Sequence, residues 1–230
     1  RSTLFPYTTL FRSSINGTRA HPYKISSTDG LDLLAKNVNG TDGFTANEFN
    51  YKHFLQTANI TYDGSENNYT PVGDIYHYFC GHYNGGGYTI SGININVNDN
   101  DIGIFGFVYT PGIVENLTLA NSTLYGFTDV GGIVGFLYGD QYDPDVSNCR
   151  VESDVTIGAA SGSAPNLGGI VGGFQCGVIS GCISAATITN NGLDYCQQFG
   201  GIVGKMNNVT VIKDCLYTGT TVTPVTRTGI

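Results

Sequence analysis

A glycine-framed pentapeptide that recurs along the chain is the feature that most restricts its fold. The sequence GGIVG occurs at 131–135, 168–172 and 200–204, and a related GIFGF occurs at 103–107. Self-similarity at a period of 20–50 residues is typical of solenoids, in which each repeat forms one structural unit. Glycines of a flexible linker would not recur in register. We therefore expect stacked repeats that start near 103, 131, 168 and 200.

Apolar residues recur in each repeat at matching offsets, which indicates what is stacked. Leu117, Cys149, Cys182 and Cys215 form one such column, with spacings of 32, 33 and 33 residues. A second column consists of Val114, Val146, Ile179 and Ile212, and a third of Ile104, Ile133, Ile170 and Ile202. One coil cannot bury its own apolar face, but stacked coils share a continuous core. The pattern predicts an all-β fold, a right-handed parallel β-helix (β-solenoid).

The glycines of the pentapeptide are interpreted as structural. Glycine weakens a strand and usually marks a tight bend or a close backbone approach. At equivalent corners it lets each coil turn without a Cβ that clashes with the next coil. This role is expected for Gly132, Gly135, Gly169, Gly172, Gly201 and Gly204.

Three segments are expected along the chain. Residues 1–13 resemble a translated sequencing adapter, since all eleven codons of TLFPYTTLFRS at 3–13 match one, and they are excluded from the fold. Residues 14–68 are expected to form an N-terminal cap with one short helix at about 29–38, where apolar residues follow helical spacing between polar and glycine ends. Residues 69–230 are expected to form the solenoid. Because a further repeat would begin at 229, we expect the chain to be a gene fragment that continues beyond both ends.

The distribution of charge excludes several classes of partner. Charged residues make up 12% of the chain, and Arg150 is the only Lys or Arg between Lys52 and Lys205. Nucleic acids, anionic membranes and polyanionic sugars all require clustered cations. No apolar stretch is long enough to span a membrane. The chain is therefore expected to bind no nucleic acid and to contain no membrane span.

The repeats resemble the GLUG motif of bacterial surface proteins, which also occurs in the non-catalytic N-terminal regions of some immunoglobulin A peptidases. The segment YTPVGDIYHYFCGHYNGGGYTISGININ at 69–96 is similar to the lead-in of that family, with YNGGG at 83–87 in place of the usual FDGNG. The resemblance covers roughly 25–230. It implies a secreted or surface-anchored extension, stalk or adhesive module, located outside the cell or on its surface. The partner would be a host protein, a matrix protein or a glycan.

Three groups of residues are of types that can bind a metal ion. His77, Cys80 and His82 are zinc-competent types, but in a strand His77 would point away from the other two. The loop residues Asp140, Asp143 and Asp145 are candidates for calcium, as are Asp99 and Asp101, although neither loop matches a known calcium pattern. Solvated turns are the favoured interpretation. No cofactor is expected, with calcium kept as the alternative.

The cysteines predict little covalent cross-linking. Side chains stacked in register within a solenoid point in parallel, so Cys149, Cys182 and Cys215 are expected to form an unpaired ladder in the core. Cys176 and Cys196 both lie in turn-side regions. They are the one pair considered as a disulfide.

No catalytic motif is present, so a non-catalytic structural or adhesive module is the favoured function. The alternative is a carbohydrate-active parallel β-helix, either glycan-binding or a hydrolase of neutral sugars. A hydrolase needs two carboxylates on one face, roughly 5–10 Å apart. Asp145, Glu152 and Asp154 are its candidates because carboxylates are densest there.

Overall fold

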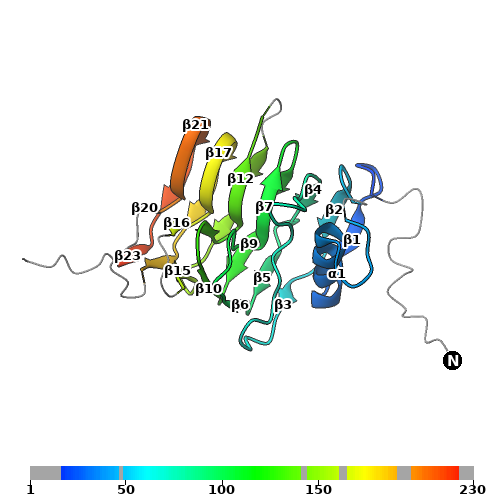
Figure 1. The fold of residues 1–230 in the computed structure, drawn as a ribbon, viewed down its shortest axis with the longest axis horizontal. Helices are drawn as coiled ribbons and strands as arrows, with labels where there is room; N and C mark the ends of the chain where they lie inside the picture. Colours follow the sequence, from blue (N-terminus) through cyan, green and yellow to red (C-terminus); the bar gives the residue numbers. More distant parts are fainter. Residues whose placement is uncertain (1–16, 47–48, 141–143, 161–164, 191–197, 223–230) are drawn as a thin grey trace, which may run out of the picture.

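The computed structural model describes residues 17–46, 49–140, 144–160, 165–190 and 198–222. Residues 1–13 and the start of the repeat expected at 229 lie outside these residues. The described chain is an all-β solenoid whose coils stack side by side along its long axis, with a single helix at the N-terminal end (Figure 1).

Four sheets of parallel strands run along the solenoid. The nine-stranded sheet contains β1 (Tyr23–Ile25), β2 (His53–Gln56), β4 (His82–Asn84), β7 (Phe105–Tyr109), β8 (Ile113–Glu115), β12 (Val134–Tyr138), β13 (Asp145–Ser147), β17 (Val171–Ser180) and β21 (Val203–Lys213). The six-stranded sheet contains β3 (Ile60–Thr61), β5 (Thr89–Ser91), β9 (Thr118–Ala120), β14 (Arg150–Val151), β18 (Ile183–Ser184) and β22 (Leu216–Tyr217). The five-stranded sheet contains β6 (Asn94–Asn96), β10 (Thr123–Gly126), β15 (Thr156–Ala159), β19 (Thr187–Thr189) and β23 (Thr220–Val222). The smallest sheet contains β11 (Val130–Gly131), β16 (Asn166–Gly168) and β20 (Gln198–Gly200). The predicted β-solenoid is thus confirmed.

The register between coils follows the columns seen in the sequence. Val146 of β13 pairs with Val114 of β8 on one side and with Ile179 of β17 on the other, and Ile179 pairs with Ile212. The three residues that precede Ile212 in this column are fully buried. The apolar repeat is therefore the core of the stack, one rung per coil.

A left-handed backbone position turns the chain between the nine-stranded and six-stranded sheets. Asn116, Asn148, Gly181 and Asp214 occupy it in four consecutive coils, with φ of 55°, 51°, 62° and 54°. Asn, Asp and Gly are the residues that tolerate this conformation best. The next residue in each coil is Leu117, Cys149, Cys182 or Cys215, which the turn directs into the core.

The glycines of the repeated pentapeptide are enclosed by neighbouring coils. A Cβ added at Gly135 would lie 2.3 Å from the carbonyl carbon of Asp101 in the preceding coil, and one added at Gly132 would lie 2.6 Å from the carbonyl oxygen of Gly169 in the following coil. The later repeats have the same geometry, which involves backbone contacts at Gly169, Gly172 and Gly204 and the ring of Tyr217 at Gly201. These positions require glycine because the contacting atoms are mostly backbone and cannot move aside.

The helix α1 (Thr28–Asn39) lies against the first coil. Ser27 caps its N-terminus and accepts a hydrogen bond from the Gly30 amide, and Gly40 ends it in the left-handed conformation. Its buried face joins the common core. Parallel stacking begins before residue 69, however, because β1, β2 and β3 already pair with one another or with later strands. The expected cap is therefore partly the first coil itself.

The contacts at Gly135 predict a large loss of stability on substitution. Gly135→Ala forces a Cβ against the backbone of Asp101 and Ile102, so we expect the free energy of unfolding to fall by about 1–3 kcal/mol, the range for overpacking. Gly30→Ala in α1 is the control, because its Cβ would be 3.6 Å from the nearest atom and alanine favours a helix. Denaturant unfolding of both variants tests this expectation. Equal stability of the two would contradict it.

Candidate functional site

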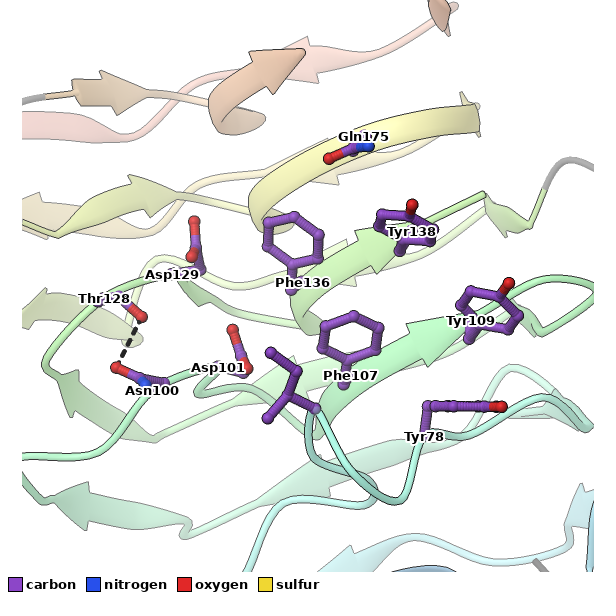
Figure 2. A pocket seen from close by; sticks show the side chains of 11 residues that line it. Tyr78, Asn100, Asp101, Phe107, Tyr109, Thr128, Asp129, Phe136, Tyr138 and Gln175 are labelled. Carbon is purple, nitrogen blue, oxygen red and sulfur yellow. Dashed lines mark hydrogen bonds between the residues drawn. The ribbon is translucent and has the colours of Figure 1, made fainter. Parts of the chain in front are cut away.

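Two rows of aromatic side chains project from the outer face of the nine-stranded sheet. Phe136 pairs in register with Phe107, and Tyr138 with Tyr109, because the segments GIFGFVY and GGIVGFLY place their rings at equal offsets. The phenyl centroids are 5.3 Å apart and the phenol centroids 5.4 Å apart, with interplanar angles of 23° and 12°. Tyr78 extends the tyrosine row, 4.5 Å from Tyr109. Figure 2 shows the rings of β7 and β12 side by side on neighbouring strands, with Tyr78 on the adjacent loop.

Both rows end at β17. Gly173 follows Phe136 in register and Gln175 follows Tyr138. A Cβ at Gly173 would lie 2.2 Å from Oδ1 of Asp129 and 2.5 Å from the Phe136 ring. The carboxylate of Asp129 therefore occupies the space that a third ring would need.

A polar column runs beside the phenylalanine row. The column consists of Asp101, Asp129 and Asn166. The residue that follows each of them pairs with its counterpart in the next coil, Ile102 with Val130 and Val130 with Leu167. Asn166 Nδ2 donates a hydrogen bond of 2.7 Å to Asp129 Oδ1. One loop position earlier, Thr128 Oγ1 donates to Asn100 Oδ1 at 3.0 Å (Figure 2).

The aromatic rows and the polar column together line a cavity of about 530 Å³, which we call the aromatic slot. Its lining residues are Ile75, Tyr78, Asn100, Asp101, Phe107, Tyr109, Thr128, Asp129, Phe136, Tyr138 and Gln175. The volume is within the usual range of small-molecule sites, and the lining combines apolar rings with a few polar groups, as such sites do.

The two carboxyl groups at the acidic end of the slot, Asp101 and Asp129, have raised pKa values. Burial, followed by the negative charges of Asp129, Asp74 and Asp99, raises the pKa of Asp101 from 3.8 to about 7. Burial also raises the pKa of Asp129, while the hydrogen bond from Asn166 and the charge of Lys205 oppose that rise. At pH values below about 7 the Asp101 carboxyl therefore keeps a proton that an isolated aspartate would have lost.

This arrangement is suited to binding a sugar. The C–H faces of a pyranose ring can pack on aromatic carbon, while carboxylate and amide groups at one end bind hydroxyl or amino groups. Tyr109 also donates a hydrogen bond of 2.9 Å from its hydroxyl to Asp140 Oδ2 at the other end of the slot. That contact fixes the tyrosine row in place.

The calcium candidates are only partly described. Asp140 accepts the hydrogen bond from Tyr109, and Asp145 lies in β13 with a buried Oδ1 that has no hydrogen-bond partner. Asp143 lies outside the described residues, so this calcium loop stays a prediction. Within the described part of the chain, no three His, Cys, Asp or Glu side chains are grouped so that they could hold a metal ion.

The possible zinc ligands are directed to different partners. His77 lies 3.3 Å from Asp74, His82 lies 2.8 Å from Glu115, and Cys80 is buried. Only His82 belongs to a strand, β4.

The candidate carboxylates of a hydrolase are not brought together. Asp145 lies in the nine-stranded sheet, whereas Glu152 follows β14 of the six-stranded sheet and binds Arg150. Asp154 accepts a hydrogen bond of 2.8 Å from the Asn121 amide. The carboxylates that share a cavity are instead Asp101 and Asp129, of which only Asp101 was singled out from the sequence, as a calcium candidate.

The cysteine column is free of disulfides. Cys149 Sγ lies 3.4 Å from the Ser147 carbonyl oxygen, and Cys182 Sγ lies 3.4 Å from that of Ser180, the same contact in successive coils. Burial raises the pKa of the Cys149 thiol, which keeps it neutral. Cys215 continues the column in the next coil. Cys196 lies outside the described residues, so its pairing with Cys176 stays a prediction.

Comparison with known proteins agrees with the repeat motif. The family model described as the GLUG motif matches residues 128–156, which confirms the resemblance in the repeat that contains Phe136 and Asp129. The chain is 32% identical over 160 residues to halomucin of Haloquadratum walsbyi, which covers 64% of this chain and 2% of halomucin. It is 35% identical over 143 residues to a protein of Evansella cellulosilytica named as a Gly-rich membrane protein, covering 59% of this chain and 15% of that protein.

The chain thus spans only a small part of these curated relatives. A solved structure named as an immunoglobulin A1 protease of Bacteroides ovatus is 14% identical, with a TM-score of 0.46 over 86% of this chain and 76% of the other. Among the described residues, α1 is too short and too polar to cross a membrane.

The raised pKa of Asp101 predicts a pH-dependent gain of stability when this residue is replaced by Asn. Between pH 3.8 and about 7 the folded state keeps a proton that the unfolded state releases, so wild-type stability falls as the pH rises through this window. We expect Asp101→Asn to be more stable than wild type at about pH 8, by at most roughly 4 kcal/mol at 1.36 kcal/mol per pKa unit, and to lose this advantage near pH 4.

Thermal unfolding across that pH range measures the effect. Glu66→Gln is the control, because Glu66 is exposed, lies outside the cavity and is not among the charges that raise the pKa of Asp101. A stability gain that is the same at both pH values would contradict the expectation.

Proposed function

We propose that this β-solenoid is a non-catalytic adhesive module of a secreted or cell-surface protein, and that it binds glycans in the aromatic slot. The observation that carries the proposal is the pair of aromatic rows beside the Asp101–Asp129–Asn166 column in one cavity. Aromatic rings held in register on consecutive rungs provide a rigid apolar surface whose side chains are already ordered, which reduces the entropic cost of binding.

The location outside the cell is supported by the relatives. The GLUG motif at 128–156 and the likeness to halomucin and to a protein named as a membrane protein favour a long surface protein in which this solenoid is one segment. A solenoid suits such a role because its coils separate a binding face from its point of attachment.

The binding role is tested by removing the tyrosine row. In the variant Tyr109→Ala/Tyr138→Ala, about 1 kcal/mol of aromatic contact is lost per ring, so we expect roughly 30-fold weaker binding to any glycan that the wild type selects on an array. Both side chains are half-buried on the outer face, so the core is left intact. Titration calorimetry gives the affinities.

Tyr76→Ala is the matched control, because Tyr76 is 80% exposed and does not line the slot. It should bind as the wild type does. Failure of the wild type to bind any glycan on the array would overturn the proposal. Release of new reducing ends from a bound glycan would overturn its non-catalytic part and would favour the hydrolase instead.

A further inference from the structure

The aromatic slot is asymmetric, with rings at one end and carboxylates at the other. Asp101 and Asp129 precede the paired residues Ile102 and Val130, so they lie on consecutive rungs, which parallel strands hold about 4.8 Å apart. Figure 2 shows both carboxylates beside the phenyl rings of Phe107 and Phe136. A ligand that lies across the slot therefore meets aromatic carbon and two acidic groups at once.

Among the described residues, the acidic end has little compensating positive charge. Asp74 and Asp99 add to the negative potential at Asp101, and Lys205 is the one described cation whose charge acts on Asp129. The nearest cation in sequence, Arg150, is bound to Glu152. An anionic sugar would be repelled here, and a neutral one would leave the carboxylates uncompensated.

The two carboxylates also differ in their free hydrogen-bonding capacity. Asp129 accepts a hydrogen bond from Asn166. Among the described residues, none donates a hydrogen bond to the carboxylate of Asp101, although this side chain lines the cavity. An ammonium group offers three N–H donors and a positive charge. It would therefore donate a hydrogen bond to Asp101 and also compensate the negative charge of the acidic end.

We infer that the aromatic slot selects a saccharide that carries a protonated amine, with the ammonium group between Asp101 and Asp129 and the sugar ring on the aromatic rows. This inference rests on the proposed glycan-binding function and adds the class of sugar. The rings of Phe107 and Phe136 add attraction, because a cation beside an aromatic face is stabilised by the ring electrons.

A sugar fits the slot better than a basic peptide side chain does. From the phenylalanine row to the tyrosine row the slot advances two residues along the strand, roughly 7 Å. A lysine side chain at the acidic end would leave the tyrosine row uncovered, whereas a chain of linked pyranose rings covers both rows and still presents its amine to the acids.

The test uses three β-1,4-linked tetrasaccharides that differ only in the group at C2: glucosamine, N-acetylglucosamine and glucose. At about pH 6.5 we expect the glucosamine tetramer to bind at least about tenfold more tightly than the other two. Binding of the ammonium removes the proton from Asp101. The free energy needed to remove this proton increases as the pH falls below the pKa, so the preference should shrink towards pH 5. The affinity of the glucose tetramer should not change over that range.

Variants separate the amine contact from the rest of the slot. Asp101→Asn should remove the preference for the amine, so that this variant binds the glucosamine and glucose tetramers with affinities within about twofold of each other. Asp99→Asn removes the same formal charge from an exposed position outside the cavity, and it should keep most of the preference.

The possible failures are distinguishable. If all three tetramers bind equally and Tyr109→Ala/Tyr138→Ala weakens all of them, the amine inference is wrong and the glycan function stands. If other glycans on the array bind and these three do not, the amine inference is again wrong. If no glycan binds but a tetralysine peptide does, with loss in Asp101→Asn, both the sugar class and the glycan function are overturned.

Discussion

Parallel hydrogen bonding between successive coils is the constraint on which the rest of this structure depends. Every pairing between named strands is parallel, so each coil repeats the path of the one before it about 4.8 Å further along the axis. Each residue therefore lies next to the residue at the equivalent position of the following coil. Core, corners and surface rows all arise from this translation.

The repeated path restricts the residue types in the core and at the corners, but not those on the outer face. Inside, Val114, Val146 and Ile179 pack directly on one another, so each coil is under the same demand for an apolar residue of moderate size. At the corners, the demand is for a backbone that accepts positive φ or for the absence of a Cβ. On the outer face no such demand exists, and among the described coils the phenylalanine row consists of Phe107 and Phe136 alone.

This difference explains how much the sequence could predict. The solenoid, its repeat starts and the cysteine column follow from demands that recur in every coil, and they are visible as spacing. The start of the stack was harder to locate, because β1 and β2 pair in parallel without the GGIVG sequence. The aromatic slot could not be derived, although equal offsets of Phe and Tyr in GIFGFVY and GGIVGFLY were a usable signal. The polar column, with Asp101 and Asp129, could not be derived either. These residues follow loops of different length, so their alignment on consecutive rungs is not visible as a constant spacing in the sequence.

Gly173 gives the slot a defined length. On this rung the carboxylate of Asp129 lies where the Cβ of any larger residue would be, so an acid and a ring compete for one place. Asp129 belongs to the coil that carries Phe136, so a coil with glycine in register with the rings, as at Gly173, leaves room for this acid and ends the apolar surface with charge. In a longer array of such coils, the number of consecutive rungs that keep the ring would set the length of ligand that binds. Duplication of a single repeat would lengthen this binding surface without altering the core.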